Sequence, residues 1–320
     1  MPAAAACALL SLTAALLTPA SLHAAPGRQA TGGLVYQGGP VMHKPTVYSV
    51  FWLPSGDSFQ PPDASSTDKD YEDINLSFLS DVSGSSLAGI LTQYSDKKGP
   101  ATDQIVYGDA WVDTRAYPHN RGSVDNPLQD SDIQGEIKRA IKTQGWQVKS
   151  NVTMIMVYTA YGIQSCDSGE GSQQGCTFSQ TNGYCGYHSF MQYKHANIVY
   201  SNLPDLSSDV CNTVDQPITS DNAPNGDVAA DIQVNNVSHE LFESITDPLA
   251  GYKPAWVGGQ DSTKEIADLC DQAWGTRDDN GGDVVLNGYD YVVQSEWSNQ
   301  DGGCVLSVGG DVLTQPSSSD

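Results

Sequence analysis

Thr46-Val47-Tyr48-Ser49-Val50-Phe51-Trp52-Leu53 is the stretch that decides the fold, because it is almost wholly apolar and is bounded by prolines. A short apolar run rich in β-branched and aromatic residues predicts a buried strand. Val152–Tyr158 has the same character and predicts a second strand that is buried on both faces. Further strand patterns occur over 105–112 and 196–200.

Helical periodicity separates these predicted strands. Apolar residues recur at helical spacing over 74–82 and again over 87–94, which predicts two short helices or one broken helix. A further helix is expected over 133–141, with Asp130 or Ser131 as its N-terminal cap. Because strands and helices alternate along the chain, we predict an α/β (α+β) fold class with a mixed sheet in layers.

The longest predicted helix runs over 229–246. Pro248 ends it, since the residue before a proline avoids the helical region. We expect a single domain over 25–313 and a disordered tail over 314–320. Four apolar residues form the expected buried stripe of this helix: Val234, Val237, Leu241 and Ile245.

Residues 1–24 have the character of a secretory signal peptide. An apolar run extends to Leu17 and a small pair, Ala24-Ala25, marks a cleavage zone, although no Lys or Arg precedes the run. No later stretch reaches the roughly 18 apolar residues that a membrane-spanning helix needs. We therefore expect a secreted, extracellular protein without a membrane span, with the periplasm or the cell wall as alternative locations.

The cysteines predict disulfide-stapled loops. The chain has seven cysteines, of which Cys7 falls in the predicted signal peptide. An even number in an oxidising compartment favours disulfides over a catalytic thiol. The sequence does not choose the pairing, although a bond between the last two would tie the C-terminal segment back. The six candidates are Cys166, Cys176, Cys185, Cys211, Cys270 and Cys304.

The charge balance excludes some partners. With 15 basic and 38 acidic residues the chain has a formal charge of −23, which repels nucleic acid and anionic lipid. An acidic surface suits calcium, basic partners or solubility. The oligomeric state is not encoded in any pattern that we find.

The motif His239-Glu240-Leu241-Phe242-Glu243 lies on the longest predicted helix. Residues four apart project from one face of a helix, so His239 and Glu243 are candidate metal ligands. In the zinc-peptidase pattern H-E-x-x-H, the second residue is the general base for the attacking water, a role that Glu240 would take here. We expect a divalent metal, zinc first and calcium as an alternative, on an active-site helix of metzincin or gluzincin type.

A third ligand is expected 22 residues beyond Glu243, at Glu265. That separation suits a loop and a second helix that returns to the site, by analogy with thermolysin-like peptidases. Asp268 and Asp247 are candidate partners that orient the ligands, although Asp247 could equally be a turn residue. His188 could be a further ligand, a catalytic acid or a structural histidine beside a disulfide, and we favour the structural role.

Other interpretations apply to the same residues. A bare H-E-x-x-E is a weak pattern, and a capped, salt-bridged helix end would also produce it. The acidic run 278–283 lacks the spaced ligands of a calcium loop, so we interpret it as a turn. The tryptophans at 256, 274 and 297 could line a sugar-binding surface, yet buried tryptophans are commoner.

Several ordered motifs together resemble the EXORDIUM or phosphate-induced protein family, secreted proteins of plant cell walls that also occur in bacteria. The resemblance implies that glutamate, here Glu243, is the residue that this family has at the fifth position of the H-E-x-x-E motif. It also implies an extracellular role connected, in plants, with growth and cell expansion. Phe242, Cys166 and Ser295 depart from the family pattern. The motifs that carry the resemblance are 38–41, 185–188, 224–228, 238–243, 246–248, 265–270, 292–297 and Cys304.

Two functional hypotheses follow. The first is a secreted, metallopeptidase-like hydrolase that uses His239, Glu243 and Glu265 as metal ligands and Glu240 as general base, and acts on an extracellular protein or peptide. The second is a non-catalytic extracellular growth-regulatory protein, or one that binds a cell-wall polymer or carbohydrate. In that case the same residues would form a structural metal site.

Overall fold

A computed structural model describes residues 32–313, except for 169–174, 178–182 and 205–216. The predicted signal peptide, the predicted tail over 314–320 and Cys211 lie outside the described residues. No helix in the described part of the chain is long and apolar enough to cross a membrane.

The centre of the fold is a five-stranded mixed sheet, so the predicted fold class is confirmed. Four strands run parallel, and the fifth pairs antiparallel with its neighbour at one edge. The strands predicted over 46–53, 105–112, 152–158 and 196–200 all belong to this sheet. In sheet order its strands are β5 (Val106–Asp113), β2 (Thr46–Trp52), β7 (Thr153–Thr159), β10 (Ala196–Leu203) and the edge strand β9 (Tyr187–Tyr193).

Smaller elements surround this sheet. Five two-stranded ladders pair β1 (Leu34–Tyr36) with β11 (Trp256–Gly258), β3 (Ser95–Asp96) with β4 (Gly99–Pro100), β6 (Leu128–Gln129) with β8 (Ser165–Cys166), β12 (Val284–Leu286) with β13 (Tyr289–Tyr291), and β14 (Glu296–Ser298) with β15 (Gly303–Val305). The helices are α1 (Asp68–Asp81), α2 (Ser86–Gly89), η1 (Ile90–Gln93), η2 (Pro118–Asn120), α3 (Asp130–Gln144), α4 (Val228–Thr246) and η4 (Asp268–Cys270).

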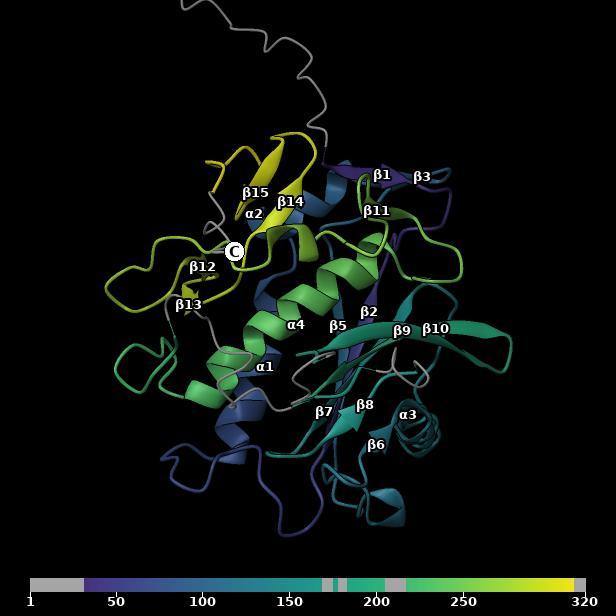
Figure 1. Cartoon of the computed structure of the whole chain (residues 1–320), viewed down its shortest axis with the longest axis vertical. Coiled ribbons are helices and arrows are strands. Elements are labelled where there is room, and N and C mark those ends of the chain that lie inside the picture. The colour runs from purple at the N-terminus through teal and green to yellow at the C-terminus, as the bar shows by residue number, and fades with distance from the viewer. Residues whose placement is uncertain (1–31, 169–174, 178–182, 205–216, 314–320) are drawn as a thin grey trace, which may run out of the picture.

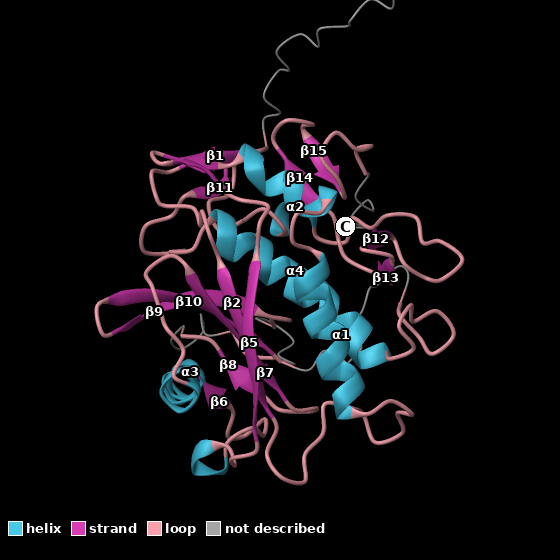
Figure 2. Ribbon diagram, turned by 180° about the vertical axis from the view of Figure 1, so that it is seen from behind, coloured by secondary structure: helices cyan, strands magenta, loops and turns pink. Residues whose placement is uncertain are grey.

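Both faces of the sheet are covered, as Figure 2 shows, with α3 on one side and α1 and α4 on the other. Strand β7 contributes alternately to two cores: Met154 and Met156 pack with α1 and α4, whereas Ile155 and Val157 pack with α3. Side chains of a strand alternate between its faces, so a strand covered on both sides must be apolar throughout. The prediction that this strand is buried on both faces is confirmed.

Two local features differ from expectation. The N-cap of α3 is Gln129, not Asp130 or Ser131, because Asp132 accepts a hydrogen bond from the Gln129 backbone N–H and completes a capping box. The Asp130 carboxylate instead accepts hydrogen bonds from the hydroxyls of two tyrosines on β9 and β10. Strand β9 was not predicted from the sequence. Polar residues interrupt its apolar ones, because it is an edge strand that other elements cover only in part.

Helix α4 passes through the centre of the molecule. It packs against α1 on one side and against β10 and β9 on another, and Figure 1 shows it crossing in front of the sheet. Asp227 caps its N-terminus by accepting a hydrogen bond from the backbone N–H of Ala230, and the helix ends two residues before Pro248. All four residues of the predicted apolar stripe are fully buried. The helix is therefore buried nearly all round, including its polar face.

Disulfides connect parts of the fold. Cys166 bonds to Cys176, and Cys270 bonds to Cys304, the pair that ties the C-terminal segment back. Cys185 is also disulfide-bonded. The prediction of disulfide-stapled loops is therefore confirmed for the described cysteines.

Candidate metal centre

The polar face of α4 carries a histidine and two carboxylates, and the C-cap residue Asp247 adds a third carboxylate. His239, Glu243 and Asp247 are four residues apart in turn, and Glu240 precedes Glu243 by three, so all four side chains lie toward one side of the helix. Glu240 is 2% exposed and Glu243 is 4% exposed. A buried carboxylate costs free energy unless a hydrogen-bond donor or a cation binds it, so this face requires partners from elsewhere in the chain.

His188 reaches this face from β9. Its Nδ1 lies 3.6 Å from Oε2 of Glu240 and 3.5 Å from Oε2 of Glu243, and its side chain is 3% exposed. On its other side, Nε2 is 3.2 Å from the backbone oxygen of Asp247. The structure thus brings His188 into the cluster, in position to be the further ligand that we considered less favoured from the sequence.

A close contact between backbone and helix positions His188. Asn236 on α4 donates a hydrogen bond to the backbone oxygen of Cys185. A Cβ atom on Gly186 would lie 2.5 Å from Oδ1 of Asn236 and 2.7 Å from Oε1 of Glu240. Any larger residue at this position would displace the Asn236 and Glu240 side chains, so glycine lets the beginning of β9 lie against the helix.

His239 lies on the opposite side of Glu243. Its Nε2 is 3.1 Å from Oε1 of Glu243 and 3.7 Å from Oδ1 of Asp268. The backbone N–H of Asp268 also donates to Oε1 of Glu243. Asp268 therefore contacts both His239 and Glu243.

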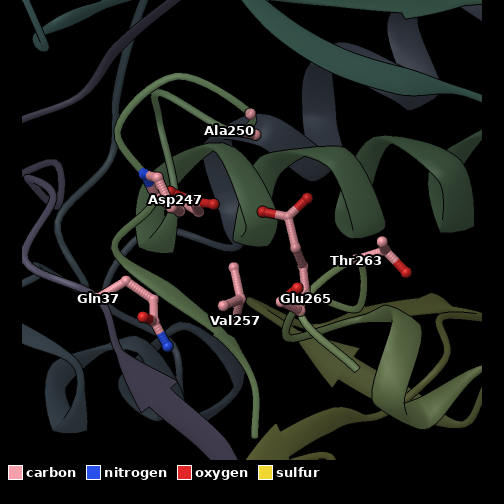
Figure 3. A pocket seen from close by; sticks show the side chains of 9 residues that line it. Gln37, Asp247, Ala250, Val257, Thr263 and Glu265 are labelled. Carbon is pink, nitrogen blue, oxygen red and sulfur yellow. The ribbon is translucent and has the colours of Figure 1, made fainter. Parts of the chain in front are cut away.

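Glu265 lies on the His188 side of the cluster. Its Oε1 is 3.6 Å from Nε2 of His188, and its carboxyl group lies beside that of Asp247 (Figure 3). Figure 3 shows the Asp247 and Glu265 side chains pointing toward one another beside a pocket of about 510 Å³. Burial raises the pKa of Asp247 to about 6.

The expected ligand set is divided between two groups of donor atoms. One group is His188, Glu243 and Glu265, and the other is His239, Glu240 and Glu243; within each, the donor atoms lie within 4.8 Å of one another. The expected second helix after Glu243 is also absent from the described chain. Glu265 lies in a loop, and only the single 3-10 turn η4 follows it, because the Cys270 disulfide and strand β14 hold this segment in place.

The segment that carries Glu265 and Asp268 is held from the C-terminal region. Gln294 donates a side-chain hydrogen bond to the backbone oxygen of Ala267, and the backbone N–H of Trp297 donates to Ile266. These contacts give the 292–297 motif a physical role, since it fixes the loop beside α4.

The titratable groups are strongly coupled. Burial alone lowers the pKa of His188 and of His239, but the surrounding carboxylates raise both well above the usual value. Burial raises the pKa of Glu265 and of Glu240, whereas the two histidines lower that of Glu243 despite its burial. The cluster is therefore most anionic at Glu243, between the histidines.

Sequence reasoning missed Glu296. This residue is fully buried, and neither carboxyl oxygen has a hydrogen-bond partner among the described residues. Burial raises its pKa well above the usual value, and the charge of His239 opposes that shift. A glutamate within the otherwise uncharged run 292–297 was the available signal for a further acidic group near the cluster.

The residues fit a divalent cation. The contacts between nitrogen and carboxylate oxygen in the cluster span 3.1–3.7 Å, close to the separation of about 3.3 Å between ligands around a tetrahedral ion with bonds of about 2.0–2.1 Å. Oε2 of Glu240 and Oε1 of Glu265 are buried without a hydrogen-bond partner in the described chain. A cation would satisfy both atoms.

The cluster opens toward a second pocket as well. His239, Glu240 and Asp268 line a pocket of about 300 Å³. Side-chain amides and an indole complete the lining and place hydrogen-bonding groups beside His239 and Glu240. These residues are Asn235, Asn236, Gln272, Trp274 and Gln294.

Comparison with known proteins gives a partial match. No protein-family model matches the chain, and no solved structure matches it. Protein EXORDIUM-like 3 of Arabidopsis thaliana is 35% identical over 92 residues, which cover 24% of this chain and 26% of that protein. The match thus spans about a quarter of the relative's length. Together with the disulfides it fits an extracellular protein, and this chain is similar, over that part, to an EXORDIUM-like protein.

Proposed function

We propose that this chain is a secreted member of the EXORDIUM family and a metal-dependent, peptidase-like hydrolase. The observation that carries the proposal is the pair His239 and Glu243 on α4 beside Glu240, at the edge of a pocket. The buried Oε2 of Glu240 makes no hydrogen bond in the described chain.

The ion would be held by His239 and Glu243, with Asp268 as a third donor. Asp268 approaches Nε2 of His239, the same nitrogen that faces Glu243, so it suits a direct ligand better than a partner for the other ring nitrogen. Imidazole with carboxylates favours zinc, whereas calcium prefers oxygen ligands alone. A divalent ion supplies Lewis acidity, which lowers the pKa of water and polarises a carbonyl.

Glu240 would accept the proton of the attacking water and return it to the leaving group. Because burial raises its pKa, it is a stronger base than an exposed glutamate once ionised. The amide side chains of the 300 Å³ pocket offer donors and acceptors that suit the backbone of an extended peptide. The proposed substrates are therefore extracellular proteins or peptides.

The test combines elemental analysis with Glu240→Gln. Purified protein and the variant are analysed for bound metal and assayed on casein and on a peptide library, with Glu72→Gln on α1 as a matched control. We expect both variants to retain the metal. Glu240→Gln should lose about 10²–10⁴-fold in turnover, the usual contribution of a general base, and Glu72→Gln should keep wild-type turnover.

Two results would overturn this proposal. Absence of bound metal in the wild-type protein would remove the basis of the site. Bound metal without turnover of any substrate by the wild type would reject hydrolysis and leave a non-catalytic, metal-stabilised binding protein.

A further inference from the structure

Glu243 lies between two histidines and presents one carboxylate oxygen to each. Oε1 is 3.1 Å from Nε2 of His239, and Oε2 is 3.5 Å from Nδ1 of His188. Two oxygens that face two different imidazoles on opposite sides are arranged as in a bridging carboxylate. Such a ligand gives one oxygen to each of two ions.

The donors on the two sides form separate groups that share only Glu243. An ion on the His239 side leaves His188 and Glu265 without a cation between them. Nε2 of His188 is 3.6 Å from Oε1 of Glu265, whereas Nδ1 of the same ring faces Glu243, and the carboxyl group of Asp247 lies beside Glu265 (Figure 3). One ring nitrogen of His188 and one carboxylate oxygen each from Glu243 and Glu265 lie within 4.8 Å of one another, so the His188 side has three donors of its own.

Two buried carboxylate oxygens on this side make no hydrogen bond in the described chain and contact His188 only at 3.6 Å, which leaves room for a cation. Oε1 of Glu265 is buried and has no hydrogen-bond partner among the described residues. Oε2 of Glu240 is also buried without a hydrogen-bond partner among the described residues. Glu240 is 2% exposed, and this oxygen lies 3.6 Å from Nδ1 of His188. Buried polar atoms in folded proteins are nearly always satisfied, so these two atoms imply a ligand between the helix and β9.

We infer that a second divalent cation binds at His188, Glu243 and Glu265, so that Glu243 bridges two ions in one centre. The inference rests on the proposed function for the first ion, on the His239 side. In two-metal hydrolases the ions lie about 3.5–4 Å apart and stabilise both the attacking and the leaving oxygen. Each side also has its own opening, because the 510 Å³ pocket reaches Glu265 and the 300 Å³ pocket reaches His239.

The experiment measures stoichiometry, not activity. Chelator-treated full-length mature protein is titrated with Zn²⁺ by calorimetry, and the loaded protein is analysed for metal content. We expect two ions in the wild type, one in His188→Ala, one in His239→Ala, and fewer than one in Glu243→Ala. His195→Ala, at the exposed turn between β9 and β10, is the matched control and should bind two.

A second measurement needs no variant, which protects the test against misfolding. Wild-type protein loaded with Mn²⁺ should give an electron paramagnetic resonance spectrum of an exchange-coupled pair, and His188→Ala should give that of an isolated ion. One ion in the wild type, retained by His188→Ala, would overturn the second site and leave the proposed function intact. Two coupled ions without hydrolysis would support the second site and reject the proposed function, whereas no bound ion would overturn both.

Discussion

Gly186 shows how a single residue can set the geometry of the centre. The backbone here approaches α4 so closely that an added Cβ would collide with Asn236 and Glu240. The same approach carries His188 into the cluster two residues later. The role of glycine at this position is thus steric, and it connects the cysteine-rich region with the helix.

We predict that Gly186→Ala reduces turnover while metal is retained. The added methyl group must displace Glu240, and overpacking of this kind costs about 1–3 kcal/mol of unfolding free energy. The matched control is Gly135→Ala within α3, where a Cβ meets nothing within 4 Å. That control should stabilise the protein by up to about 1 kcal/mol. Equal effects of the two variants on turnover would contradict the steric role of Gly186.

Asp231 makes stability depend on pH. It is 1% exposed on the first turn of α4, and burial raises its pKa to about 7 even though Asn225 donates two hydrogen bonds to it. The unfolded value is about 3.9, so between about pH 4 and 7 the folded protein holds the extra proton. Its contribution to the free energy of unfolding therefore falls as pH rises through that range.

We predict that Asp231→Asn flattens this part of the stability profile. A difference of one in pKa corresponds to about 1.4 kcal/mol, so the slope is measurable by urea denaturation at several pH values. The exposed Asp279→Asn is the control and should keep the wild-type slope. Parallel profiles for wild type and Asp231→Asn would show that this carboxyl group does not carry the effect.

At the scale of elements, α4 organises both the core and the site. One side contributes the fully buried stripe, and the other contributes the motif residues to the candidate metal centre. A shift of this helix would move both at once. The cap at its N-terminus is therefore connected with function as well as with stability.

We predict that Asp227→Ala destabilises the protein by about 1–3 kcal/mol. The variant loses the N-cap hydrogen bond to Ala230 and leaves the buried side-chain amide of Gln60 without this acceptor. Ser85→Ala removes the equivalent cap of the four-residue helix α2 and should cost about 1 kcal/mol or less. Chemical denaturation of both variants gives the comparison, and a larger loss at Ser85 would refute the importance assigned to α4.

At the scale of the whole molecule, the C-terminal region completes the centre. Residues 292–297 and the Cys270–Cys304 disulfide hold the loop that carries Glu265 and Asp268. The two donors thus depend on contacts with a part of the chain about 30 residues further on. Stability and metal affinity are expected to respond together when this connection is removed.

We predict that replacing Cys270 and Cys304 together by serine costs roughly 4 kcal/mol, from the entropy of closing a loop with a separation of 34 residues. Metal affinity should fall as well, measured by calorimetric titration. The control replaces Cys166 and Cys176, which close a loop of only 10 residues and donate nothing to the cluster. It should cost less and leave metal affinity unchanged. Unchanged affinity in both double variants would separate the disulfide from the centre.

Local patterns determined much of this protein. Strands β2 and β7 and helix α4 follow from the periodicity of their own apolar residues, and the spacing of His239 and Glu243 places both on one helix face. The N-cap of α3 shows the limit of such reasoning. Any of the three adjacent polar residues 129–131 could cap the helix there. Asp130 does not, because its carboxylate accepts hydrogen bonds from tyrosines of β9 and β10.

The tertiary structure alone decided which donors meet. His188 reaches α4 because β9 pairs with β10 in one register and Gly186 lets the backbone approach, and Glu265 lies on the His188 side because β14 and a disulfide hold its loop. Periodicity is a property of neighbouring residues, so the sequence by itself determined the elements and the motif on α4. Contacts between segments far apart in the chain depend on packing, and packing divided the expected ligands between the two sides of Glu243.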